Sequence, residues 1–314
     1  MELTVPTPSE VQAGLRAVKT LLTLESPLNP IETKLLAAVQ RHILHSDVEL
    51  DRLEPIEPAA LAAAIERQPV REQLLMGMVV ALFASGDAQP SQLEQARAYA
   101  DALAVELHEL EDLRLLIERR LTLLRFDVLR RIYIGETLTN AWKHEGAAGL
   151  VERLARFKGW AEDPELAARY LALGDLPEGT LGRAYFEHCR GDGFAFPGER
   201  YGSPEEIAVH DMAHVLGGYG TDPAGEMQVA AFTAGFRKRE QSLSIMLFVL
   251  CQFDLGVPMV PVAEPELGFF EPEAFMKALR RGAEMNLDLF DGWDYWAVVD
   301  QPLEVLRERY NIAV

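Results

Sequence analysis

Apolar residues recur at helical spacing through most of the chain. After Pro30 they stand at Ile31, Leu35, Leu36, Val39, Ile43 and Leu44. Spacings of three and four residues place these side chains on one face of a helix. The same pattern predicts helices over residues 70–82 and 93–103, and one longer helix over residues 107–133. No stretch of this part alternates apolar and polar residues as a strand would, so the pattern predicts a helical bundle.

Helix starts are marked by capping boxes. Two of them are Thr7-Pro8 with Glu10, and Asn29-Pro30 with Glu32. A side-chain oxygen before a helix accepts from free amides of the first turn, and the acidic residue three positions later bonds back to the cap. Proline at the first helical position loses no hydrogen bond, because its amide would have no partner there. These signals predict helices that begin at Pro8 and Pro30.

The second half of the chain is also predicted to be helical. Glycines and a turn over residues 174–179 interrupt the pattern between residues 134 and 180, which indicates a domain junction. Further helices are predicted over residues 181–190 and 243–253, after Pro272 and after Pro302. We therefore expect an all-α protein with two helical domains, an N-terminal bundle over residues 1–134 and a C-terminal domain over residues 135–314.

Composition places the chain among folded proteins and narrows its partners. The 314 residues are 49% hydrophobic and 25% charged, with a formal net charge of −19. Such a charge argues against non-specific binding of nucleic acid, which needs many Lys and Arg residues. Two cysteines, Cys189 and Cys251, provide no disulfide framework, and the N-terminus lacks a signal-peptide pattern. We expect a cytoplasmic protein, and the apolar stretch 243–251 is too short to span a bilayer.

The candidate chemistry lies in residues 203–226, SPEEIAVHDMAHVLGGYGTDPAGE. Ser203, Pro204 and Glu206 form a predicted capping box, which places His210 near the middle of the next helix. His210 and His214 are one turn apart and share a helical face. Asp222-Pro223 starts another helix, with Glu226 in its first turns. Two imidazoles and a carboxylate predict a divalent metal site, with zinc or iron the best matched ions.

Alternative interpretations of these residues stay open. Asp211, beside the first histidine, could bind the metal, orient a ligand or face solvent. The histidines could instead be hydrogen-bonded to carboxylates in a polar core. The zinc-protease pattern HExxH is not matched, because Asp211 is a methylene shorter than glutamate. A His-Asp phosphohydrolase would need a further histidine and aspartate, for which His188 and Asp254 are the candidates.

The motif resembles the Coq-four family, coenzyme Q biosynthesis protein 4. That family carries H-D-x-x-H, eleven residues, then E, and here His210, Asp211, His214 and Glu226 match it in type and spacing. The resemblance extends from LPEGTLGRAY (176–185) to the closing QPLEVLRERYNI, and covers roughly residues 136–314. It implies an all-helical fold, those four residues as ligands of a metal usually given as zinc, and a role in maturing a prenylated quinone head group.

The resemblance also implies partners. Family members are linked to replacing the ring carboxyl by a hydroxyl, organise other quinone-biosynthesis proteins, and bind an isoprenoid tail at a membrane surface. We therefore expect a prenylated quinone precursor or another isoprenoid lipid as ligand, with peripheral contact at the inner face of the membrane; a homodimer stays open. Candidates for contacting the lipid or its anionic head group are Arg237, Lys238, Arg239, Leu247 and Phe248.

The N-terminal half is a departure from that family, whose typical members lack it. Residues 74–107, with the Ser-Gly-Asp break between two helices, weakly resemble the tellurite-resistance TerB-like bundles. That resemblance implies a fold only, and we expect a structural or interaction module. A scaffold or lipid carrier with a structural metal is therefore a second hypothesis beside an enzyme of quinone biosynthesis.

Overall fold

The described residues are built from α-helices and short 3-10 or π turns, which confirms the predicted all-α class. The computed structural model describes residues 3–132, 162–237, 239–260 and 263–313. Within these ranges, β-structure is limited to two isolated bridges, Thr180 with Pro302 and Leu255 with Leu267. None of the helices in the described part of the chain combines the length and apolar content needed to cross a bilayer.

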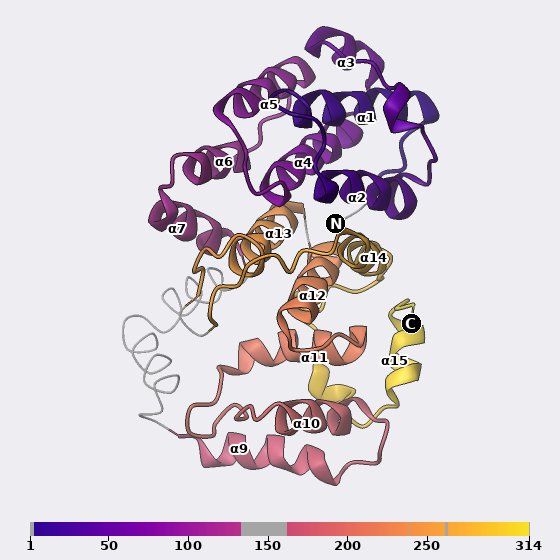
Figure 1. Cartoon of the computed structure of the whole chain (residues 1–314). Coiled ribbons are helices and arrows are strands. Elements are labelled where there is room, and N and C mark those ends of the chain that lie inside the picture. The colour runs from indigo at the N-terminus through magenta and orange to yellow at the C-terminus, as the bar shows by residue number, and fades with distance from the viewer. Residues whose placement is uncertain (1–2, 133–161, 238, 261–262, 314) are drawn as a thin grey trace.

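The N-terminal helices form the upper part of the molecule (Figure 1). They are α1 (Pro8–Leu22), α2 (Pro30–Val39), α3 (Pro58–Ala64), α4 (Gln68–Ala84), α5 (Pro90–Leu103), α6 (Glu109–Ile117) and α7 (Leu121–Arg131). The capping boxes at Thr7 and Asn29 are both formed, and Asn29 Oδ1 accepts from the Glu32 amide at 2.8 Å. A π turn, η1 (Gln40–Leu44), continues α2. The short helix α3 has no counterpart among the predicted ones.

The prediction of a single helix over residues 107–133 is wrong. The chain forms α6 and α7 instead, and it turns between them at Arg119, whose φ of 57° is left-handed. Folding back brings Arg131 into ion pairs with Glu109 and Asp112, and its Nη1 donates to Ser244 Oγ at 2.9 Å. Long-range pairing of these groups therefore overrides a periodicity that favours one continuous helix.

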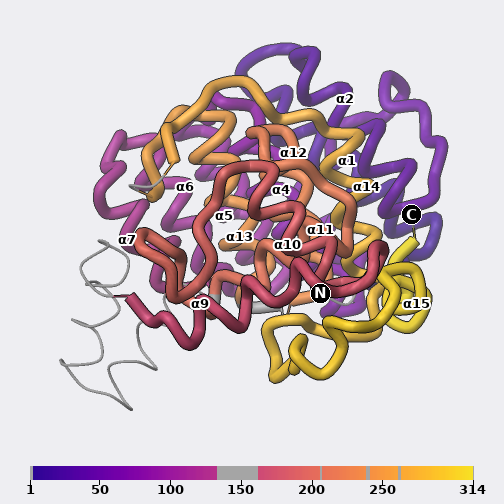
Figure 2. Tube along the Cα trace, turned by 90° about the horizontal axis from the view of Figure 1, so that it is seen from below, coloured from indigo at the N-terminus to yellow at the C-terminus, as the bar shows by residue number. Residues whose placement is uncertain are grey.

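The C-terminal helices follow after the undescribed residues 133–161. They are α9 (Pro164–Leu171), α10 (Leu181–Gly191), α11 (Ala208–Gly217), α12 (Pro223–Phe236), α13 (Arg239–Phe253), α14 (Pro272–Ala283) and α15 (Leu303–Arg309). The 3-10 turns of this part are η3 (Ala172–Asp175), η4 (Glu205–Ile207) and η5 (Tyr295–Ala297), and one more, η2 (Leu50–Arg52), lies among the N-terminal helices. α13 and α14 lie directly below the N-terminal helices, and α12 leads from them down to α11 and α10 (Figures 1 and 2).

The apolar core is continuous between the two predicted parts of the chain. α13 packs against α4 and α7, and α14 packs against α2. Leu243, Leu247 and Leu250 of α13 are each at most 2% exposed, so this apolar stretch is a buried helix. The predicted boundary near residue 135 lies outside the described residues, and the division into two domains stays a prediction.

A close helix crossing joins α12 to α14. A Cβ at Gly282 would overlap the carbonyl oxygen of Phe232, and one at Gly235 would overlap that of Leu279. The absence of side chains at these two glycines lets the backbones touch. This contact sets the position of α12, whose first turn carries Glu226.

We expect Gly282→Ala to lower the free energy of unfolding by about 2 kcal/mol or more, because an added methyl forces two packed backbones apart. Gly191→Ala is the matched control, since a Cβ there meets no atom within 4 Å. Urea denaturation of both variants checks the expectation. Equal stability of the two would contradict the close crossing.

A second expectation concerns pH. Burial raises the pKa of Asp112 to about 7, although Arg131 opposes the shift. The folded protein then keeps a proton that the unfolded chain releases near the ordinary value of 3.8. Because the folded state binds more protons in this interval, Asp112 makes the protein less stable as the pH rises from about 4 to about 7.

Asp112→Asn removes that titration. The stability of the variant relative to the wild type should therefore increase with pH across this window, by an amount on the order of 1–3 kcal/mol. Urea denaturation of both proteins at several pH values measures the difference. Parallel stability curves would show that Asp112 is ionised in the folded protein throughout.

Candidate metal centre

The two histidines stand on a helix that begins later than its capping pattern predicts. The α-helix starts at Ala208, after the 3-10 turn η4, and no side chain caps either element. The predicted capping box at Ser203 is therefore wrong, and His210 lies in the first turn of α11 rather than near its middle. Glu205 explains the difference, because its Oε1 accepts hydrogen bonds from Tyr170, Tyr295 and Trp296. These distant aromatic groups fix the backbone before α11.

The carboxylate comes from the next helix. α11 ends at Gly217, and the next residue, Gly218, adopts φ 72° as a left-handed cap. Asp222 Oδ1 accepts from the Gly225 amide at 2.8 Å and starts α12, as predicted. The connection between the helices is short, so the two pack together and Glu226 faces the histidines.

Three donor groups converge at this point. His210 Nε2 lies 3.2 Å from His214 Nε2. Glu226 Oε2 lies 3.4 Å from His210 Nε2, and Glu226 Oε1 lies 3.4 Å from His214 Nε2. The His214 side chain is 1% exposed, whereas His210 and Glu226 are 20% and 26% exposed. The group is therefore closed on the His214 side and reachable on the other.

These separations suit ligands of one ion better than hydrogen bonds between the groups. N–H···O bonds cluster near 2.9–3.0 Å, and both contacts of Glu226 are longer. Donors bound tetrahedrally to zinc at about 2.0–2.1 Å are separated by about 3.3–3.4 Å. The two imidazole nitrogens are 3.2 Å apart, and Glu226 offers a different oxygen to each of them at 3.4 Å. Two imidazole nitrogens and one carboxylate are also the donor types that zinc and iron take. The three residues therefore fit a divalent cation.

The electrostatics of the group also favour a cation. Burial would raise the pKa of Glu226, but the two imidazoles outweigh it and hold that pKa well below its usual range. Burial acts against the charged form of His210, yet Glu226 raises the pKa of His210. The site therefore favours an ionised carboxylate at Glu226, and a cation bound to neutral imidazoles would neutralise that charge.

The rings are oriented by groups outside the motif. His214 Nδ1 lies 3.4 Å from the carbonyl oxygen of Tyr219. A proton on Nδ1 leaves the lone pair of Nε2 for a metal, which is the common arrangement of a ligating histidine. The turn that carries this carbonyl is itself held, because Arg281 donates to the carbonyl of Gly217 and Arg307 to that of Leu216. The end of α11 thus has partners for its free carbonyls.

Asp211, the fourth predicted ligand, is not in the converging group. Burial raises its pKa to about 6, and His210 and His214 partly offset the shift. Burial raises the pKa of Tyr185 and of Cys189 on α10, and the charge of Asp211 adds to both shifts. Direct ligation by Asp211 stays a prediction.

The two residues named for a phosphohydrolase lie in different places. His188 of α10 stacks on His214, with ring centroids 5.4 Å apart, but it is not among the converging donors. Asp254 follows α13, where its Oδ1 accepts from the Phe270 amide at 3.1 Å. The structure therefore brings only the histidine near the site.

Three of the five predicted lipid-contacting residues have described side chains, and these are buried or partly buried. Arg237 is 4% exposed, and its Nη1 lies 3.0 Å from Asp288 Oδ1. Leu247 is fully buried, and Phe248 is partly buried against the core. Lys238 lies outside the described residues, and Arg239 is the first residue of α13. Binding of a lipid or head group by these five residues stays a prediction.

Comparison with known proteins adds no assignment. The chain matches no protein-family model, and no curated protein is significantly similar to it.

The stacked histidine generates an expectation about stability. His188 Nε2 is buried and, among the described residues, has no hydrogen-bond partner. An unsatisfied buried polar atom costs about 1–3 kcal/mol, so His188→Phe should raise the unfolding free energy of chelator-treated protein by about 1 kcal/mol. Urea denaturation measures this. His108→Phe, at a half-exposed position, is the control: it removes an ion pair with Asp127 and should lower the free energy of unfolding by no more than about 1 kcal/mol. A clear loss of stability in His188→Phe would mean that the imidazole has an essential partner.

Proposed function

We propose that this chain is a divalent-metal protein of the Coq-four type, which acts on or binds a prenylated quinone precursor or a related isoprenoid lipid. The convergence of His210, His214 and Glu226 carries the proposal, because three of the four residues that match the family motif bring their donor atoms together. The metal is zinc in the first instance, with iron as the alternative.

The donor set is suited to chemistry as well as to structure. Three protein ligands leave a coordination position open, as catalytic sites do and closed structural sites do not. A divalent cation held there would polarise a ring carboxyl or lower the pKa of a bound water. His214 and the Tyr219 carbonyl keep one wall of the site rigid, while the partial exposure of His210 and Glu226 gives a ligand access.

The lipid part of the proposal is supported by the resemblance. On that basis the reacting group is the carboxyl-bearing ring of a prenylated aromatic acid, and the protein works in the cytoplasm or at the inner face of the membrane. Association with other quinone-biosynthesis proteins and a homodimer belong to the same proposal. The alternative is a scaffold or lipid carrier, in which the same three residues bind a structural metal. Loss of that metal would then unfold the protein.

Metal analysis tests the central claim. Protein purified in zinc or in iron should hold one ion per chain, and His210→Ala or Glu226→Gln should weaken its binding by more than about 100-fold, since a direct ligand matters more than an outer-shell partner. Elemental analysis and competition with a chelator provide the measurements. His108→Ala, a matched change at a remote histidine, should leave the metal bound.

The same variants separate catalysis from scaffolding. If His210→Ala stays folded by circular dichroism but no longer converts or binds a prenylated aromatic acid, the metal is functional. If the variant unfolds, the metal is structural. Absence of bound metal from wild-type protein prepared with either ion would overturn the proposal.

A further inference from the structure

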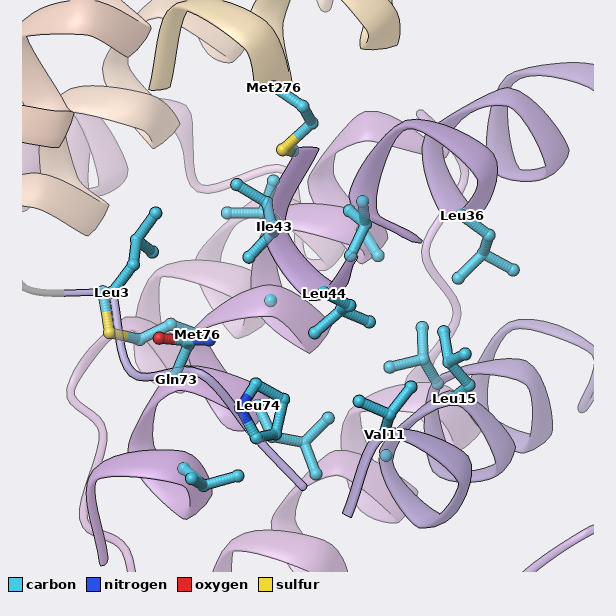
Figure 3. A pocket seen from close by; sticks show the side chains of 18 of the residues that line it. Leu3, Val11, Leu15, Leu36, Ile43, Leu44, Gln73, Leu74, Met76 and Met276 are labelled. Carbon is cyan, nitrogen blue, oxygen red and sulfur yellow. The ribbon is translucent and has the colours of Figure 1, made fainter. Parts of the chain in front are cut away.

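An apolar cavity of about 130 Å³ lies where the N-terminal helices meet α13 and α14. Its walls come from α1, α2, η1 and α4, with Met246 of α13 and Met276 and Leu279 of α14. Figure 3 shows Met276 reaching in from α14, opposite Leu74 and Met76 of α4. Both predicted parts of the chain therefore contribute to one cavity.

The wall of the cavity reaches the protein surface at Gly77. This glycine is exposed, lines the cavity in the middle of α4, and a Cβ there would meet no atom within 4 Å. Leu74 and Met76 beside it are only partly buried. Glycine within a helix is less stable than alanine, and an empty apolar void lowers stability further. The chain thus keeps open space at a position where a larger residue would fit.

The walls are adaptable. Met76, Met246 and Met276 come from three different helices, and the flexible thioether side chain can adjust to the shape of a ligand. The π turn η1 adds Ile43 and Leu44, and such turns occur frequently at functional sites.

The polar groups of the lining already have partners within the protein. Gln73 Oε1 accepts from the Thr4 amide at 2.9 Å, and Gln73 Nε2 donates to the Thr4 carbonyl at 3.2 Å. Glu10 accepts from the Thr7 amide at 2.7 Å and pairs with Arg67. These bonds hold the segment with Leu3 against the cavity, as Figure 3 shows. A ligand inside would therefore be recognised by its apolar surface alone.

We propose that this cavity binds the end of a hydrocarbon chain, either a straight acyl chain or an isoprenoid. An apolar cavity of about 150 Å³ accepts benzene, so this one takes about six carbons, and the rest of the chain leaves past Gly77.

The cavity and the metal centre are separate. Leu279, in the cavity wall, also contacts Gly235 of α12, and Glu226 lies nine positions before Gly235, about 13 Å along the helix. Binding of a hydrocarbon chain in the cavity therefore requires neither a metal nor a quinone.

Methionine-methyl NMR tests it directly. Protein with ¹³C-labelled methionine methyl groups is titrated with decanol, for a straight chain, and with geraniol, for an isoprenoid. Saturable shifts are expected for Met76, Met246 and Met276, while Met212 and Met227 beside the metal centre stay unchanged. A response to only one alcohol identifies the chain type. No saturable response to either alcohol, or shifts confined to other methionines, overturns the proposal.

Two variants narrow the proposed entrance at Gly77. Gly77→Leu and, from a partly buried position, Leu74→Trp should each weaken binding of the alcohol by at least about tenfold. Gly191→Leu is the matched control, at a glycine with open surroundings at the end of α10. Circular dichroism confirms folding before the titrations. Unchanged affinity in both entrance variants overturns the proposal. His210→Ala should bind the alcohol as the wild type does, so loss of the metal and loss of the cavity are distinguished.

Discussion

The crossing of α12 over α14 is the contact on which the rest of the molecule depends. Gly235 and Gly282 allow the two backbones to touch, and each end of the pair then has a separate use. Toward one end, α12 presents Glu226 to the histidines, and Arg281 of α14 holds the carbonyl that ends α11. Toward the other, Met276 of α14 faces the N-terminal helices across the apolar cavity. One close helix pair therefore positions both candidate sites.

The parts of the fold that could be predicted were those with local causes. Asp222 caps α12 through a backbone amide three residues away, and the box at Thr7 works in the same way. The errors have distant causes. The start of α11 depends on the aromatic partners of Glu205, and the break at Arg119 depends on ion pairs made by Arg131. The periodicity of apolar residues along the sequence does not indicate such contacts.

In the candidate site, too, the features with local causes could be predicted and those with distant causes could not. The four-residue spacing of His210 and His214 and the short connection to Glu226 were sufficient to predict that these groups meet. His188 reaches the site from α10, and nothing in its local sequence indicates that it stacks on His214. Arg237 belongs to a basic cluster that was predicted to contact a lipid or its anionic head group, and its side chain is buried in a pair with Asp288. Charge patterns alone do not distinguish a surface cation from a buried one.

Arg307, which binds the end of α11, is translated much later than the residues of the candidate metal centre. Its guanidinium binds the carbonyl of Leu216, which precedes it by 91 residues. The helix with both histidines is therefore translated long before the group that completes its last turn. Contacts so far apart in sequence form slowly, because a long loop must close first. During that interval the last turn of α11, which carries His214, lacks the side chain that binds two of its carbonyls, so the candidate site is complete only when α15 has docked.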